Sequence, residues 1–587
     1  MFAAPDLNDS NIEQWYVRFY NYLKKIRIPG KIILILMGIL STAWFLFRVI
    51  PKPSRAYYPC VRATAPFMSG FVLYLLSLVS VSYIIKKMKT SGRKLFSTSS
   101  FLMVFLLIFL AIVNITSNSS VSLSQEALPM GPQDGPNKPF GTGRGVKPGT
   151  VVWVWNPDAT NENCKNKAEN NDWYFTQANT NEAVAGKMVS DAIMKLGGSN
   201  DLNKAWDALF RQFNKEKTGK KKGYSAGQKV FIKINQGTAS WALSKDEQAN
   251  AYTVSKDIKP GQRRGRFSAA TETAPYIVLE ILKELVNNAG VSQQDIYVGD
   301  PISHIFGHNY SVWQAEFPDV KYVDKFSDQF GRTLIKPTEK ELLYYSDKKQ
   351  ADKLFDIIEQ ADYMINVASL KPHGSAGISI TSKNHFGSHA RRSASHLHYA
   401  LIAPLWEESP RQAGKASNGG YKKYRVLVDL MGSKYLGQNT LLFIADGLFG
   451  GGADETRGPV KYFMSPFKND WSNSVFVSQD QVALESVCYD FLRTEWNGKN
   501  KHDEANSVFE EGPNMPGVDD HLHQAADSKN WPEGIVYDPD NSGKSIGSLG
   551  VHEHWNNAAE KLYSGNMGKK NGITLIAIPD TLIGNRN

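Results

Sequence analysis

Residues 362–400 contain the densest group of side chains that could bind a ligand or react with one. A hydrophobic run that predicts a buried strand, Tyr363–Val367, leads directly into a polar loop. The loop contains three glycines, Gly374, Gly377 and Gly387, where we expect the backbone to approach a bound group. Lysine and arginine in such a loop can hold a phosphate or carboxylate, and histidine can transfer a proton or bind a metal ion. We therefore expect this stretch to form the floor of an active or binding site. Its candidate side chains are Lys371, His373, Lys383, Asn384, His385, His389 and Arg391.

Polar residues also follow other predicted strands, at the point where each strand ends. Asn235, Asp300 and Asp446 each come directly after a hydrophobic run. The carboxyl ends of parallel strands meet at one edge of a sheet, so these residues can share a crevice with Lys371 and His373. An aspartate after a strand has a simpler explanation as a turn former or helix cap. The coincidence of four such strand ends favours a shared site.

The histidines suggest metal binding. All twelve lie between residues 304 and 554. A spacing of four places two imidazoles on one helical face, and a spacing of two places them on one strand face, as metal ligation requires. No pair matches HExxH, so capping and surface roles are the alternative. Nitrogen and oxygen ligands would favour a divalent zinc, iron or manganese ion. The pairs are His304/His308, His385/His389, His396/His398, His521/His523 and His552/His554, and the assigned ligands are His373, His385, His389, His552 and His554.

The lysines allow two interpretations. Lys371 and Lys383, beside glycines, can hold a phosphate or carboxylate, or Lys383 and Asn384 can form a structural hydrogen-bond network beneath the loop. The chain has no GxxxxGK[ST] phosphate loop and no Gly-x-Ser-x-Gly elbow. Neither Cys164 nor Cys488 has an activating context, although a single disulfide between them is an alternative to two free thiols. A serine or cysteine hydrolase is therefore disfavoured.

Composition and net charge indicate a folded protein and a membrane anchor rather than a nucleic-acid-binding protein. The chain has 587 residues, of which 42% are hydrophobic and 21% are charged, and this balance supports a packed core. The net charge is +10, but many lysines and arginines flank apolar segments near the N-terminus, where they set membrane orientation. The remaining basic residues are scattered, so we expect no nucleic-acid partner.

Three apolar runs predict a membrane region with three transmembrane helices: Ile32–Ile50, Pro66–Ile85 and Ser100–Ile115. Each has about the length needed to cross a ~30 Å hydrocarbon core. Basic residues concentrate before the first run and between the second and third, and none follows the third run until Lys138. We therefore expect an anchor in the lipid bilayer of a bacterial inner membrane, with a cytoplasmic N-terminus and a large periplasmic domain. Basic residues in the first connecting loop leave open an interfacial position for the first run.

The pattern predicts three parts, namely a membrane region at 1–116, a flexible linker at 117–149 and an α/β domain at 150–587. The linker is rich in serine, proline, glycine and asparagine. In the third part, strands are expected at 151–155, 229–234, 296–299, 321–323, 363–367, 441–445, 474–477 and 573–578. Helices are expected at 181–196, 201–214, 273–289, 349–361 and 480–494. This alternation predicts a mostly parallel sheet covered by helices on both faces.

The helix expected at 273–289 has the clearest end signals. Thr273 is a suitable N-cap, Pro275 falls in the first turn, and Gly290 is a stop. Strand, helix and strand joined by a long crossover indicate a parallel pair.

Six motifs follow one another in the third part: FIKIN (231–235), YVGD (297–300), LKPHGSAGISITSKNHFG (370–387), FIADGLFGGG (443–452), SQDQVALESV (478–487) and GSLGVHEHWNNA (547–558). In order and spacing they resemble the domain of unknown function 362 family, across about residues 228–580. The resemblance implies a Rossmann-like α/β domain, often on exported or iron–sulfur proteins of bacteria. Some members carry ferredoxin-like cysteine motifs, which this chain lacks. The positions that the motifs carry over are Asn235, Asp300, Lys371, His373, Lys383, Asn384, Asp446, Asp480, His552 and His554.

No general reaction is assigned to that family, so two hypotheses stand. In the first, the domain is an enzyme, or descends from one, and acts on an anionic small molecule or envelope component. Lys371 and Lys383 would hold the anion, while His373 and Asp446 would transfer protons or ligate a metal. The residues expected to contact the ligand are Asn235, Asp300, Asn384 and Arg391.

The second hypothesis is a non-catalytic scaffold or accessory subunit of a cell-envelope assembly, which would dock protein partners on the α/β domain. Aromatic residues that we expect on the surface favour it, as does a long insertion. These features are Trp153, Trp155, Trp241, Trp313 and residues 405–424.

Overall fold

The computed structural model describes residues 135–166, 172–236, 270–325, 328, 331–402, 421–452, 458–496 and 518–584. The three N-terminal apolar runs, Trp241 and residues 405–420 lie outside the described residues. Within the described ranges, no helix has both the length and the apolar character that a membrane crossing requires.

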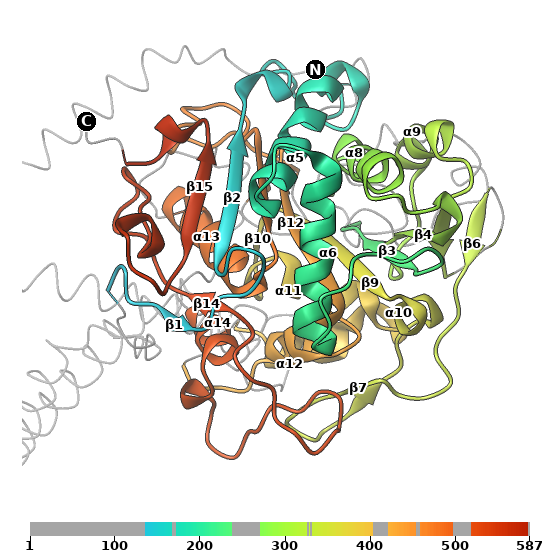
Figure 1. Ribbon diagram of the computed structural model, residues 1–587, viewed down its shortest axis with the longest axis vertical. Coiled ribbons are helices and arrows are strands. Elements are labelled where there is room, and N and C mark those ends of the chain that lie inside the picture. The colour runs from blue at the N-terminus through green and yellow to red at the C-terminus, as the bar shows by residue number, and fades with distance from the viewer. Residues whose placement is uncertain are drawn as a thin grey trace, which may run out of the picture. The chain divides into compact units, whose positions relative to one another are not determined.

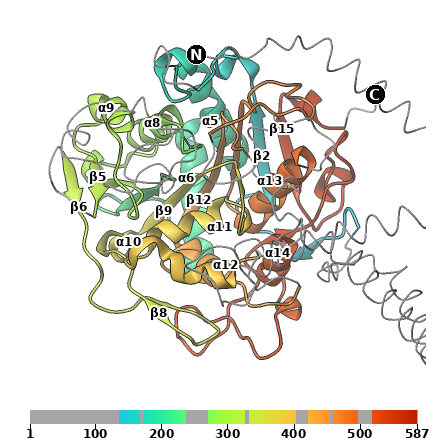
Figure 2. The same cartoon turned by 180° about the vertical axis from the view of Figure 1, so that it is seen from behind.

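A nine-stranded sheet forms the centre of the fold (Figures 1 and 2). Its strand order is β15-β2-β13-β12-β9-β3-β4-β5-β6, and β13 alone in this sheet runs antiparallel to its neighbours. The mostly parallel α/β sheet expected from the sequence is therefore confirmed. The strands are β2 (Thr150–Trp155), β3 (Val230–Lys233), β4 (Ile296–Gly299), β5 (Lys321–Asp324), β6 (Arg332–Leu334), β9 (Tyr363–Ser369), β12 (Thr440–Gly447), β13 (Ser474–Ser478) and β15 (Thr574–Ile578).

The strands are apolar on both faces because both faces are covered. Successive side chains of a strand point to opposite faces of a sheet. On β2, Val152 and Val154 pack into one hydrophobic core, and Val151 and Trp153 pack into the other. Trp153 and Trp313 are both fully buried, so the expectation of surface aromatics at these two positions was wrong.

Helices cover both faces of this sheet (Figures 1 and 2). The helices on one face are α5 (Glu182–Gly197), α6 (Leu202–Thr218), α8 (Pro275–Lys283) and α9 (Gly307–Glu316). Those on the other are α10 (Asp356–Gln360), α11 (Thr381–Asn384), α12 (Val426–Gly432), α13 (Gln481–Glu495) and α14 (Val518–Ala526). Three short antiparallel pairs lie outside the main sheet. They are β1 (Phe140–Gly141) with β14 (Val551–His552), β7 (Leu343–Tyr344) with β8 (Ala351–Asp352), and β10 (Pro372–His373) with β11 (Gly377–Ile378).

Two expected helices differ from the structure. The helix expected at 349–361 is confined to α10, because residues 351–352 pair as β8 with β7. The helix expected at 273–289 begins at Pro275 as α8 and continues as a π-helix, Glu284–Asn288. Its N-cap is Ala274 rather than Thr273, and the chain turns at Gly290, which has a left-handed φ of 72°.

Candidate functional site

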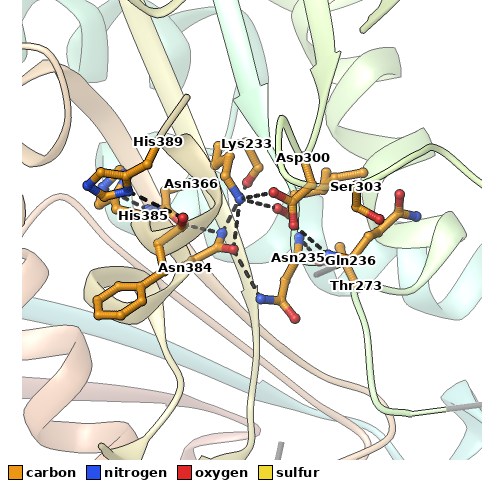
Figure 3. A network of polar contacts seen from close by, with 12 residues as sticks. Lys233, Asn235, Gln236, Thr273, Asp300, Ser303, Asn366, Asn384, His385 and His389 are labelled. Atoms are coloured by element: carbon orange, nitrogen blue, oxygen red, sulfur yellow. Dashed lines mark hydrogen bonds and ion pairs between the residues drawn. The ribbon is translucent and has the colours of Figure 1, made fainter. Parts of the chain in front are cut away.

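A buried lysine lies at the centre of a polar network at the carboxyl end of β3 (Figure 3). Lys233 Nζ lies 3.0 Å from Asp300 Oδ1, which follows β4. It also donates to Asn384 Oδ1 at 3.0 Å and to the carbonyl of Ile234 at 2.7 Å. Burial lowers the pKa of Lys233, and the neighbouring Asp300 carboxylate opposes that shift. The lysine thus joins the ends of two strands to α11.

Lys233 and Asn366 lie opposite each other in the parallel pairing of β3 and β9. Both side chains point to the face of α11, where Asn366 donates to the carbonyl of Thr381 at 2.9 Å. Our sequence reasoning missed both residues because it considered only polar residues after the strands. A polar residue within an apolar strand was the signal that could have found them, since burying one is costly unless it is hydrogen-bonded.

Two amides extend this network beyond the end of β3. Asn235 Nδ2 donates to Asn384 Oδ1 at 3.1 Å, and the backbone N–H of Gln236 donates to Asp300 Oδ2 at 2.9 Å. Among the described residues, Asn235 Oδ1 and both side-chain polar atoms of Gln236 have no hydrogen-bond partner. Each such buried group costs about 1–3 kcal/mol. A ligand that bonded to them would offset that cost.

Asp446 lies at the end of β12 and holds the start of α8. Its carboxylate accepts from the backbone N–H groups of Ala274 at 2.6 Å and Leu448 at 3.0 Å. Burial raises the pKa of Asp446 to about 6, although these two hydrogen bonds oppose the shift. The adjacent Thr273 hydroxyl accepts from the N–H of Asn235 at 2.9 Å. Asp446 therefore adjoins the Lys233 network through residues 273–274.

The loop after β9 places its lysines and histidine in buried positions. Lys371 Nζ donates to the carbonyl of Thr271 at 2.6 Å. His373 Nδ1 accepts from the N–H groups of Ser375 and Ala376 at 3.0 and 3.2 Å, so the proton of the neutral ring lies on Nε2. Lys383 Nζ lies 3.6 Å from the centre of the Phe386 ring, a cation–π contact.

His385 and His389 face different partners, although they are four residues apart. The chain leaves α11 at Asn384 and continues as a 3₁₀ helix, His385–Ser388, whose tighter winding changes the angle between the two side chains. His385 Nε2 lies 3.1 Å from Asn366 Nδ2, and His389 Nε2 lies 4.0 Å from Asp352 Oδ2. Burial lowers the pKa of both rings, that of His389 to about 4.

Arg391 belongs to a separate group centred on Asp352. Arg391 Nε lies 2.9 Å from Asp352 Oδ1, and Asp352 Oδ2 accepts from His396 Nε2 at 2.6 Å and from the Tyr345 hydroxyl at 2.5 Å. Burial raises the pKa of Asp352, but the hydrogen bond from His396 and the nearby His389 outweigh it and lower the pKa. The contacts of Arg391 thus lie with β8 rather than with the Lys233 network.

His552 and His554 lie in a third group. Their rings are 4.9 Å apart, and the His552 ring is 4.8 Å from that of His523. In the part of the chain that the structure describes, one set of three metal-ligand side chains converges within 4.8 Å, and it is Asp519, His523 and His552.

A glycine allows the closest approach to the Lys233–Asp300 pair. A Cβ atom at Gly387 would lie 2.2 Å from Asp300 Oδ1 and 2.9 Å from Lys233 Nζ. We expected this glycine to let the backbone approach a bound group. In the structure it lets the 3₁₀ helix His385–Ser388 approach the ion pair.

Residues 258–490 match the family described as Domain of unknown function (DUF362). This stretch of the chain belongs to the DUF362 family. It is shorter than the 228–580 resemblance expected from the motifs, and it includes Asp300, Lys383 and Asp446 but not Asn235. A comparison with curated proteins found no match.

The DUF362 stretch supplies six of the nine strands of the main sheet. It contains β4, β5, β6, β9, β12 and β13, while β2, β3 and β15 lie outside it. The polar network joins Asp300 and Asn384, from within the stretch, to Lys233 and Asn235, which precede it. The structure thus brings three predicted site residues together around Lys233. The roles assigned to these residues, and to Lys371, His373, Lys383 and Asp446, stay predictions.

Proposed function

We propose that the carboxyl end of β3, β4 and β9 binds a small anionic molecule, in a domain that is an enzyme or descends from one. The observation that carries the proposal is the combination of a buried Lys233–Asp300 pair with three amide atoms, Asn235 Oδ1 and both side-chain polar atoms of Gln236, that lack partners among the described residues. Ligand sites of open α/β sheets lie at the carboxyl ends of the strands. Amides supply donors and acceptors that fix a ligand's orientation.

Two further lysines and two groups that could transfer a proton support the same proposal. Lys371 and Lys383 bring two more ammonium groups to this edge, and both are nine-tenths or more buried. Asp446 has a pKa of about 6, close to the range in which a carboxyl group exchanges protons efficiently at neutral pH. The neutral His373 ring carries its proton on Nε2 and lies in the same loop as Lys371. In this proposal the lysines hold the anion, and Asp446 or His373 transfers the proton.

We also propose a cellular location for this protein. The three apolar runs would cross a bacterial inner membrane, and the Rossmann-like α/β domain would lie in the periplasm. The ligand would then be a periplasmic small molecule or a component of the envelope.

Thermal unfolding of the purified full chain in detergent tests the binding site. Citrate and inorganic phosphate should raise Tm at constant ionic strength, whereas glucose should not. Gln236→Ala should remove the response, because it deletes amide atoms that the ligand would contact. Gln294→Ala, at an exposed position, is the control and should respond like the wild type. A wild-type chain that responds to neither anion, or a Gln236→Ala variant that responds fully, would contradict the proposal.

A further inference from the structure

We propose that Asp519, His523 and His552 bind one divalent transition-metal ion, with His554 beside them. The site is independent of the anion site proposed above and lies beyond the DUF362 stretch. The ligand atoms of Asp519, His523 and His552 all lie within 4.8 Å of one another. Two imidazole nitrogens and one carboxylate oxygen are ligands that zinc accepts.

Local structure explains why these four side chains meet. Asp519 and His523 are four residues apart on α14, so they share one helical face. His552 and His554 are two apart in extended chain, so they point the same way. Glu553 between them points elsewhere and accepts from the N–H of Ile573 at 2.5 Å.

His521 and His523 do not share one face, as the spacing of two would place them on a strand. Both residues lie in a helix, where a spacing of two places side chains about 200° apart. His521 Nε2 accordingly lies 3.2 Å from Glu485 Oε2, away from the cluster. The sequence analysis therefore missed Asp519, the true neighbour of His523, because it did not expect α14.

Ligand-to-ligand distances fit a metal site. His554 Nε2 lies 3.1 Å from Asp519 Oδ1, and His552 Nε2 lies 3.8 Å from the same oxygen. Ligands about 2.0–2.1 Å from a tetrahedral zinc ion are about 3.3 Å from each other.

Hydrogen bonds on the far side of each ring leave Nε2 as the metal-facing atom. His554 Nδ1 lies 2.8 Å from Asp490 Oδ1, a carboxylate that can only accept. His552 Nδ1 lies 2.8 Å from Ser486 Oγ, whose own proton goes to the carbonyl of Val482. Each ring, with its proton on Nδ1 when neutral, turns Nε2 toward Asp519 Oδ1, which is 3.8 Å away for His552 and 3.1 Å away for His554.

The third ring has the same arrangement. His523 Nδ1 lies 2.7 Å from the hydroxyl of Tyr421, and that hydroxyl donates to Asn530 Oδ1 at 3.5 Å. Partners of this kind on the outer nitrogen are the usual support of metal-binding histidines.

The ion would tie α14 to the segment that begins with β14. Through Ser486 and Asp490 it would also hold both to α13.

Metal titration of the full chain tests the site. The protein is purified in detergent, treated with EDTA and titrated with Zn²⁺ by calorimetry and with Co²⁺ by visible absorption. We expect about one equivalent of either ion, with a tetrahedral Co²⁺ spectrum and a higher Tm. Asp519→Asn and His523→Gln should weaken binding at least about 100-fold, and Ser486→Ala about 10–100-fold.

His521→Gln is the matched control, since it replaces a buried histidine of the same helix that faces Glu485. It should bind Zn²⁺ like the wild type. The proposal is overturned if the wild type binds no Zn²⁺, or if Asp519→Asn binds as tightly as His521→Gln. Asp519 is 20% exposed, so its near-isosteric replacement by asparagine should leave the fold intact. Ser486→Ala removes no ligand and gives a second readout.

Discussion

A charged residue that lies inside a strand is the main feature of the proposed anion site. Lys233 is completely buried, and Asp300 and Asn384 surround its ammonium group. Breaking a buried pair leaves an uncompensated charge, which costs more than removing the whole pair.

This asymmetry gives the first prediction. Lys233→Met should lower the free energy of unfolding by about 3–5 kcal/mol, because Asp300 would remain buried without its cation. The double variant Lys233→Met/Asp300→Asn should recover part of that loss. Urea denaturation measures both values. If Lys233→Met lost less free energy of unfolding than the double variant, the explanation by an unpaired buried charge would be contradicted.

The approach of Gly387 to the same pair gives a second prediction. Gly387→Ala places a methyl group 2.2 Å from Asp300 Oδ1, so the 3₁₀ helix or the pair must shift. We expect a loss of about 1–3 kcal/mol in the free energy of unfolding. Gly547→Ala is the control, since a Cβ there meets no atom within 4 Å. Equal stability of the two variants would show that the 3₁₀ helix is loosely held.

A buried histidine gives a prediction of pH dependence. His308 stacks on Phe175 with ring centres 3.9 Å apart, and burial lowers its pKa to about 3. In the unfolded chain a histidine has a pKa of about 6.5, so below that pH the unfolded chain takes up a proton that the folded chain refuses. His308 should therefore destabilise the fold by about 2–3 kcal/mol between pH 6.5 and 4.5.

Unfolding free energies of the wild type and of His308→Gln, measured across that interval, test this expectation. The variant should lose less stability on acidification than the wild type. Parallel pH profiles would mean that His308 titrates normally in the folded protein.

At the scale of elements, the sequence predicted the sheet more accurately than the site. The central strands are hydrophobic runs, and the expected strand at 363–367 lies within β9, Tyr363–Ser369. The prediction of a helix over 349–361 was wrong for the residues before 356. Asp352 accepts hydrogen bonds from Tyr345 and His396, and hydrophobic periodicity does not show such contacts. Lys233 was missed because only polar residues after the strands were considered, although its partners Asp300 and Asn384 come from the end of β4 and from α11.

Asp480 shows that one residue can join several elements. It is the N-cap of α13 and accepts from the N–H of Ala483 at 2.9 Å. Its other oxygen accepts from the N–H groups of Arg144 at 2.9 Å and Val551 at 3.2 Å. It therefore fixes the start of α13, the loop before β2 and the start of β14.

Asp480→Ala should consequently lower the free energy of unfolding by more than the loss of an ordinary cap does. We expect a loss of about 2–4 kcal/mol, since a cap alone contributes about 1 kcal/mol and two further N–H groups lose their acceptor. Asp201→Ala is the matched control, because Asp201 caps α6 and accepts from the N–H of Lys204. Chemical denaturation measures both, and equal losses would reduce Asp480 to a simple cap.

At the scale of the molecule, the described cysteines allow the proposed orientation to be tested. Cys164 and Cys488 are free and buried, so the alternative of a disulfide between them was wrong. Burial raises the pKa of Cys164 to about 12 and that of Cys488 well above its usual value. Both thiols should therefore react slowly with maleimides.

In a Cys60→Ser background, a cysteine introduced at the exposed Ser225 should be labelled in cells with a permeabilised outer membrane by a maleimide that cannot cross the inner membrane. A cysteine introduced at Ser10 should be labelled only after lysis. Protection of Ser225→Cys in such cells, with labelling on lysis, would place the α/β domain in the cytoplasm.

The pairing of β2 sets the order in which the fold can be completed. β2 lies between β13 and β15, so its two partners are made more than 300 residues after it. Until then its backbone groups have no strand to bond with, and an open edge of this kind invites aggregation. A chain secreted from its N-terminus would need a chaperone, or rapid export, to protect β2 until the last strand emerges.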